Sequence, residues 1–586
     1  MRPQERGVAM SSLPFDPARY YGYTELTALC RQWAALYPDL CDLQAIGTTP
    51  QGREIWCLTL TNRETGPDHE KPGYLLDANV HAGEVTTASA ALYTVHRLLT
   101  EYGSVPATTA LLDTRALYVI PRISADGAEQ YLTTPYMPRS VARLWPYPEE
   151  RPGLQPEDVD DDGRILSMRI PDPEGDWLVD PADRRLMLRR PADHRGGIYY
   201  RIYTEGFIKE WDGRSVRRAP PRWGLDFNRN YPAFWNPEAR QPGAGAFPLS
   251  EPEPRAVAQW LTSHSNIAAY VSLHTTGGIL LRPPAMGSDE KIPAADVALF
   301  NALGEVCRRL TGYPCKSTYE AFAYDPREAL VKGADDWAYE HLGIMAYTLE
   351  LWDLDGRSGT RGYAHVGLKG LLALSPAEWA GDERKRLAWN DSELGGRGFV
   401  DWHPFHHPQL GDVEIGGWEP KFVRQNPPPG RFLLEECERA WAFVREHALA
   451  TPRLELGRCE VRSLAPGLWQ LAVAVRNTGY LASHVTQMAL DIKQAQPVTV
   501  SLGLPEAARL VAGRGGEPSA LGLTRSLGHL EGRAGADSAI WGFGDPPASD
   551  AWAEWVLTAP AGTEVTITAT APRAGTARCS LILSAP

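Results

Sequence analysis

The chain has 586 residues, of which 43% are hydrophobic, so it is long enough to form more than one packed domain. Its formal net charge is −13, which argues against a nucleic-acid partner. No apolar run reaches the roughly 18 residues that a membrane span needs, and no signal peptide is recognisable, so we expect a cytoplasmic protein without a membrane partner. The eight cysteines include no Cys-x-x-Cys pair, which indicates reduced core thiols rather than a disulfide framework.

The first hundred residues show both helical and strand patterns. Residues 24–37 carry apolar side chains at helical spacing and predict a helix. Residues 42–48 and 54–60 predict two strands around a Pro-Gln-Gly turn. Residues 74–80 form an apolar run too short for a helix, and 85–99 return to helical spacing. This last pair predicts a buried strand that leads directly into a helix.

The same alternation continues after a long interruption. A further strand is expected within 111–120, whereas 138–222 are rich in proline, arginine and aspartate and show little periodicity. Residues 267–273 and 344–351 predict two more buried strands. Helices are predicted over 250–261, 294–310 and 431–448.

Strands that alternate with helices predict an α/β domain, with a mixed, largely parallel sheet and helices on both faces. We assign this domain to residues 18–450 and treat 138–222 as an irregular insertion. After residue 452 the pattern changes to strand-like segments separated by glycine, proline and serine. This change predicts a separate all-β sandwich over 452–586.

Four polar residues follow or end the predicted buried strands. His81 and Glu84 lie three residues apart on the strand-to-helix turn, and His274 and Glu350 lie near the ends of two other strands. In open α/β sheets such positions meet at one crevice. His81, Glu84 and His274 would then provide two imidazoles and a carboxylate for a catalytic zinc ion, with Glu350 free to act as general base. Taken alone, His274 is more typical of a core histidine than of a metal ligand.

Five motifs occur in a fixed order along the chain. In chain order they are the HxxE of His81–Glu84, the DxNRN of Asp226–Asn230, the SxH of Ser272–His274, the segment 333–339 and the TxEL of Thr348–Leu351. In these motifs, over roughly residues 20–450, the sequence resembles the zinc carboxypeptidases of the carboxypeptidase A and B type. The resemblance implies one zinc ion per chain and hydrolysis of C-terminal residues from peptide substrates.

The resemblance also assigns roles to single residues. Asn228 and Arg229 would hold the substrate's C-terminal carboxylate, Arg229 through its planar fork. Asp335 corresponds to the position that lines the pocket for the departing side chain. An acidic residue at that position implies a preference for C-terminal lysine and arginine. Tyr324 is the nearest candidate for the family's mobile tyrosine.

The sequence departs from the family pattern at two places. The arginine that often precedes the glutamate of HxxE is Gly83 here. The arginine that stabilises the oxyanion should lie upstream of DxNRN, where Arg214, Arg217, Arg218 and Arg222 compete. Two other functions stay open. One is a related zinc amide hydrolase acting on peptidoglycan fragments or amino-acid conjugates, and the other is a binding protein with an inactive peptidase fold. The oligomeric state is not predicted.

Two further clusters contain residue types that bind metal ions. Asp158, Asp160 and Asp162 have the alternating spacing of a Ca²⁺ loop, but Arg169 stands where an EF-hand needs a glutamate, so a solvated acidic turn is favoured. The cluster His403, His406 and His407 is interpreted as surface or packing histidines.

Overall fold

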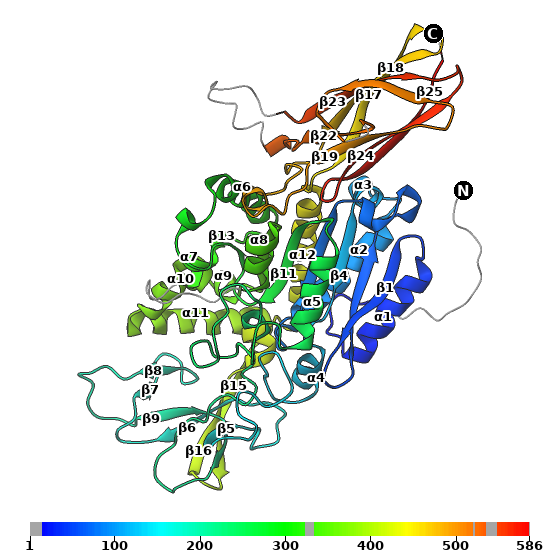
Figure 1. Ribbon diagram of the computed structural model, residues 1–586. Helices are drawn as coiled ribbons and strands as arrows, with labels where there is room; N and C mark the ends of the chain where they lie inside the picture. The colour runs from blue at the N-terminus through cyan, green and yellow to red at the C-terminus, as the bar shows by residue number, and fades with distance from the viewer. Residues whose placement is uncertain (1–13, 323–332, 520–521, 535–547, 585–586) are drawn as a thin grey trace.

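The computed structural model describes residues 14–322, 333–519, 522–534 and 548–584. A central sheet of eight strands lies in the middle of the molecule, with separate groups of strands above and below it in Figure 1. The order across the central sheet is β1 (Cys41–Thr48), β2 (Glu54–Leu60), β4 (Ala116–Ile120), β3 (Gly73–Ala78), β11 (Ile267–Thr275), β14 (Met345–Leu351), β12 (Ile279–Arg282) and β13 (Cys315–Ser317).

The central sheet is mixed, and its middle strands β4, β3, β11 and β14 run parallel. The side chains of β3 and β11 are buried throughout, because helices cover both faces of the sheet. Successive residues of β14 face the two opposite helical layers that cover the sheet. Tyr347 packs against the first layer, and Thr348 hydrogen-bonds to Asp335 in the second layer. The first layer contains α2 (Val85–Glu101), α6 (Ala294–Thr311) and α12 (Arg431–Leu449), and the second contains α5 (Pro252–Ser263) and α8 (Ala334–Leu342). The predicted fold class is thus confirmed.

The strand predicted within 111–120 is β4, at the end of that range. The residues before it form helix α3 (Pro106–Thr114), which begins with proline at its first position. After β4 the chain turns and continues into helix α4 (Ala125–Thr133).

The segment predicted to be irregular contains short strands instead. These strands are β5 (Gly153–Pro156), β6 (Ser167–Pro171), β7 (Trp177–Val179), β8 (Met187–Arg189), β9 (Tyr200–Thr204) and β10 (Gly206–Lys209). None is longer than five residues, so none is long enough to show a clear period in the sequence. β6 also pairs with β16 (Gly411–Trp418), which follows β15 (Phe399–His407) much later in the chain. We call the sheet β15-β16-β6-β9-β7-β8 the insertion sheet.

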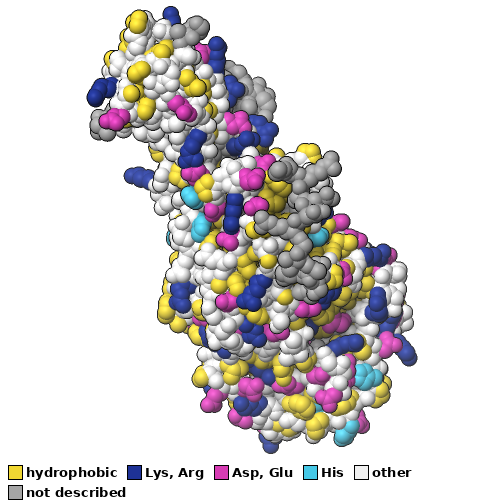
Figure 2. Space-filling view, turned by 90° about the vertical axis from the view of Figure 1, so that its right-hand side faces the viewer, with side chains coloured by type: hydrophobic (Ala, Val, Ile, Leu, Met, Phe, Trp, Pro, Cys, Tyr) yellow, Lys and Arg dark blue, Asp and Glu magenta, His cyan; other side chains and the backbone are white. Residues whose placement is uncertain are grey.

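The C-terminal strands form two antiparallel sheets around a core of their own that includes Trp469, Trp555 and Ile567. They appear as a separate lobe at the top of Figures 1 and 2. The strands are β17 (Leu454–Ala465), β18 (Leu468–Asn477), β23 (Asp550–Thr558) and β20 (Arg509–Arg514) in one sheet, and β21 (Glu517–Pro518), β22 (Thr524–Gly528), β19 (Val498–Gly503), β24 (Glu564–Ala571) and β25 (Gly575–Ile582) in the other. We keep 18–450 and 452–586 as proposed domain limits.

On the face shown in Figure 2, acidic and basic side chains are interspersed rather than gathered into large patches of one sign. Among the helices of the described ranges, none combines the length and the apolar character needed to cross a bilayer.

Candidate metal centre and active site

Three neighbouring parallel strands bring the predicted site residues to one edge of the central sheet. His81 and Glu84 follow β3, His274 belongs to β11 and Glu350 belongs to β14. In the register of β11 and β14, His274 lies directly beside Glu350. Because the carboxyl ends of parallel strands meet at the same edge, residues that lie far apart in the sequence meet there.

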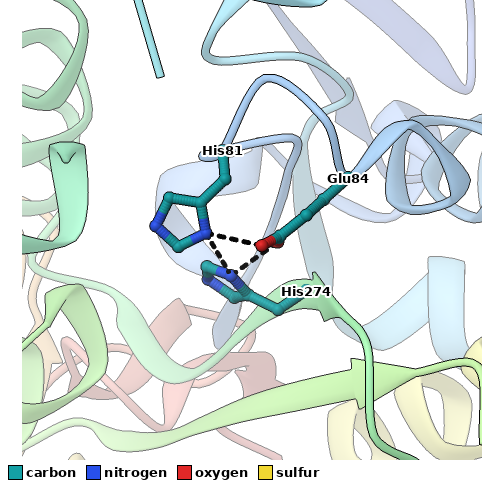
Figure 3. Close-up of side chains that lie close together, drawn as sticks. All are labelled: His81, Glu84 and His274. Atoms are coloured by element: carbon teal, nitrogen blue, oxygen red, sulfur yellow. Dashed lines mark hydrogen bonds and ion pairs between the residues drawn. The ribbon is translucent and has the colours of Figure 1, made fainter. Parts of the chain in front are cut away.

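The turn between β3 and α2 is held in place by Asn79. Its φ of 55° lies in the left-handed region, which asparagine tolerates better than most residues. The Asn79 side chain donates a hydrogen bond to the carbonyl oxygen of His81 (2.7 Å) and accepts one from Arg122 (2.9 Å). This turn directs His81 and Glu84 toward His274 on the neighbouring strand (Figure 3).

The side chains of His81, Glu84 and His274 converge on one point and are all buried. His81 Nδ1 lies 2.8 Å from one Glu84 carboxylate oxygen, and His274 Nδ1 lies 2.9 Å from the other. The two imidazole Nδ1 atoms are 3.1 Å apart. Ligands held at about 2.0–2.1 Å around a tetrahedral zinc ion are separated by roughly 3.3 Å, so this spacing suits a bound zinc ion.

The partner of His81 on its other ring nitrogen provides a chemical test of that fit. His81 Nε2 lies 3.0 Å from Asp226 Oδ1. Burial raises the pKa of Asp226, but the positive charge of Arg139 outweighs this effect. The pKa is held well below its usual range, so the carboxylate is ionised. In the tautomer that carries its proton on Nε2, His81 donates a hydrogen bond to this carboxylate, and the lone pair of its Nδ1 points at Glu84 and His274. A lone pair facing a carboxylate is unfavourable unless a cation lies between them, and a second-shell carboxylate of this kind is usual for metal-binding histidines.

Glu350 is a second buried carboxylate beside the three donor residues. Its Oε2 atom is buried and has no hydrogen-bond partner among the described residues. Burial raises the pKa of Glu350 well above its usual value, and the negative charge of Glu84 raises it further. A carboxyl group whose affinity for a proton is increased in this way is suited to accept one during a reaction.

A family model described as zinc carboxypeptidase matches residues 26–153 and 201–363, and these ranges contain all the residues placed above at the sheet edge. The chain belongs to the zinc carboxypeptidase family. Members of this family depend on zinc, and the group of His81, Glu84 and His274 can bind a metal ion. The gap in the match falls inside the insertion. A second model, for a domain of unknown function (DUF8731), matches residues 453–582.

Individual relatives are distant. Carboxypeptidase B of Bos taurus is 25% identical over 352 residues, which cover 58% of this chain and 64% of the relative. Zinc carboxypeptidase of Saccharothrix mutabilis subsp. capreolus is 28% identical over 127 residues, which cover 22% of this chain and 29% of the relative. The chain thus spans less than two thirds of the length of either protein. The structure of carboxypeptidase A from Helicoverpa armigera matches at 16% identity with a TM-score of 0.38, covering 66% of this chain and 76% of that one.

The arginine beside the donor residues is Arg139, which the sequence analysis missed. Its Nε donates to Asp226 (2.9 Å), and its Nη1 lies 3.4 Å from Glu84. Of the four arginines considered from the sequence, Arg222 pairs with Glu150 and Glu157, and the remaining three, Arg214, Arg217 and Arg218, are exposed. Arg139 lies at the start of the insertion, 87 residues before Asp226. Arg139 is therefore too far from the DxNRN motif in the sequence to be predicted from its neighbours.

Gly83, where relatives often carry arginine, lies under the side chain of Gln425. A Cβ atom built on Gly83 would be 2.7 Å from both Nε2 and Oε1 of Gln425. Such a contact is far shorter than van der Waals distance, so any larger residue at this position would require Gln425 to move. The segment around Gln425 therefore packs directly against the turn that carries His81 and Glu84.

The two residues predicted to bind the substrate carboxylate lie next to His274. The Asn228 amide nitrogen is 3.2 Å from His274 Nε2, and its Oδ1 accepts a hydrogen bond from the backbone of Ala334 (3.3 Å). The Arg229 guanidinium donates to the Asn228 carbonyl oxygen (3.1 Å) and makes no ion pair within the described residues. Its remaining donors are thus available to a ligand.

Asp335 lies in the first turn of α8 and is only 5% exposed. Burial raises the pKa of its carboxyl group, although a hydrogen bond from Thr348 partly offsets this. Tyr324, the candidate for the family's mobile tyrosine, lies outside the described residues.

In the acidic turn formed by Asp158, Asp160 and Asp162, carboxylate oxygens accept hydrogen bonds mainly from backbone N–H groups of the same turn. Asp158 accepts hydrogen bonds from the N–H groups of Asp162 and Gly163, and Asp160 lies 2.8 Å from His403 Nε2. This arrangement gives no support for Ca²⁺. His403, His406 and His407 lie on β15, where His406 pairs with Asp412 and the buried His407 contacts the Gly206 carbonyl oxygen.

Proposed function

We propose that this protein is a zinc-dependent metallocarboxypeptidase that removes C-terminal residues from peptides. One zinc ion per chain would be held by His81, Glu84 and His274. The observation that carries the proposal is the convergence of the buried His81 Nδ1, His274 Nδ1 and Glu84 carboxylate on one point, with Asp226 at the other ring nitrogen of His81. Glu350 stands beside this position with a buried oxygen that no described residue hydrogen-bonds.

Each neighbouring residue then has a role in the reaction. Zinc at this position would polarise the scissile carbonyl group and lower the pKa of a water molecule. Glu350 accepts a proton from the attacking water and transfers it to the leaving amine. Arg139 stabilises the negative charge that develops on the carbonyl oxygen. Asn228 and Arg229 hold the terminal carboxylate of the substrate, so that the last peptide bond lies next to Glu350.

The direct test is to incubate the zinc-loaded protein with a mixed peptide library and to identify the trimmed ends by mass spectrometry. We expect the loss of single residues from C-termini and no internal cleavage. A parallel incubation with peptidoglycan fragments and N-acyl amino acids tests the amidase alternative. If only those compounds are cleaved, the function is that of a related amide hydrolase. If zinc binds but no compound is cleaved, the protein is a binding protein with a peptidase fold.

Asp335 is proposed to give the pocket for the departing residue a preference for arginine and lysine. A carboxylate in a largely desolvated pocket pairs with a cationic side chain and is left unpaired by an apolar one. We expect peptides ending in arginine or lysine to be cleaved with a kcat/KM about tenfold or more above that of matched peptides ending in phenylalanine or leucine.

The variant Asp335→Ile should reverse this order, while its zinc content stays that of the wild type. Equal cleavage of the arginine and leucine peptides by the wild type would show that Asp335 does not contact the departing side chain.

A further inference from the structure

A cavity of about 710 Å³ lies between the candidate active site and the insertion sheet. Arg139 and Asp226, which contact the donor residues, form part of its lining. Most of the remaining lining is apolar and comes from the insertion and from the residues around the end of β16, including Leu154, Ile165, Pro221, Trp223 and Trp418. We call this cavity the insertion groove. It borders the active site at Arg139 and Asp226, and much of its wall comes from the insertion and the end of β16.

The charges in the insertion groove are unevenly compensated. Arg139 is paired with Asp226, and Arg222 is paired with Glu157. Arg218 also lines the groove, is exposed and makes no ion pair within the described ranges. The uncompensated charge is therefore positive, which disfavours a basic side chain in the groove.

A peptide bound by its C-terminus needs space for the residues that precede the cleaved bond. The residues proposed to hold its end, Asn228, Arg229 and Asp335, do not line the insertion groove. Arg139, proposed to contact the carbonyl oxygen of the cleaved bond, does line it. The groove therefore begins where the departing residue ends and the rest of the substrate starts.

From these observations we propose that the insertion groove binds the substrate residues immediately before the cleaved bond, and that it selects peptides with apolar side chains there. This inference rests on the proposed carboxypeptidase function. The zinc carboxypeptidase model matches neither residues 154–200 nor any residue after 363, and these two stretches supply Ile165, Leu166 and Trp418 of the wall. We therefore attribute the selection to this chain's own additions. An apolar side chain that enters the groove gains the transfer free energy of its buried surface.

The test uses two tetrapeptides with the same C-terminal residue, preceded either by leucine and phenylalanine or by glycine and serine. We expect the wild type to cleave the apolar peptide with a kcat/KM about tenfold higher. Met137 is 42% exposed and Ile165 is partly buried, and both line the groove, so the double variant Met137→Ser with Ile165→Ser should fold normally. It should reduce the preference to within about twofold by lowering kcat/KM for the apolar peptide.

The matched control is Ile198→Ser, which removes a 67% exposed apolar side chain from the insertion without touching the groove lining, and it should keep the full preference. A wild type that cleaves both peptides equally, or a double variant that keeps the preference, would overturn the proposal while leaving the carboxypeptidase function intact. If neither peptide is cleaved, calorimetric binding of the two peptides to zinc-loaded Glu350→Gln protein decides. Equal affinity for both peptides would then refute the groove as a binding site.

Discussion

Glu350→Gln is expected to lower kcat by about 10²–10⁴-fold while the protein keeps its zinc ion. The substitution preserves the size of the side chain and removes only its ability to accept a proton. Because the Glu350 carboxylate lies beside His274 but is not one of the three donors, the group that holds the metal stays complete. The measurement is steady-state cleavage of the best library peptide, combined with the zinc-to-protein ratio of the same preparation.

The control is Glu305→Gln, which makes the same chemical change at an exposed ion pair with Arg308 on α6. It should leave both kcat and zinc content unchanged. Glu350→Asp should retain some activity, because the base is kept but its carboxylate is withdrawn by one methylene. A Glu350→Gln protein with nearly normal turnover would mean that another group accepts the proton.

His81→Ala and His274→Ala are expected to lose the zinc ion and, with it, all activity above background. Each removes one of three ligands from a site in which the metal has few alternatives. The residual activity of these variants should therefore stay at background even with added zinc in modest excess. Zinc content after dialysis and circular dichroism separate metal loss from unfolding.

Asp226→Asn should give an intermediate result, a zinc affinity about 10–100-fold weaker, because it weakens the hydrogen bond that orients His81 without removing a ligand. The control is His69→Ala at a solvent-exposed histidine, which should bind zinc as the wild type does. If the wild type contains no zinc after purification and gains no activity on addition of zinc, the assignment of all three ligands is wrong.

The donor residues and the central sheet could be predicted from the sequence because both depend on short-range patterns. His81 and Glu84 are three residues apart on the turn that leads into α2, so this short turn brings their side chains together. The strands that carry His274 and Glu350 are buried on both faces, which produces the continuous apolar runs of a parallel sheet. The edge at which these residues meet then follows from the general rule for parallel strands.

What the sequence alone could not determine depends on contacts across long stretches of chain. The insertion sheet includes the pairing of β6 with β16, where Arg169 is aligned with Glu414, 245 residues away. Segments of three to five residues carry too little periodic signal to show this pairing in advance. The position of Arg139 beside Asp226 has the same cause, since the folded insertion closes a long loop and returns the chain to the site. Thus the sequence by itself determined the sheet and the grouping of the proposed donor residues, whereas only the tertiary structure decided which arginine joins them and what shape the groove beside them has.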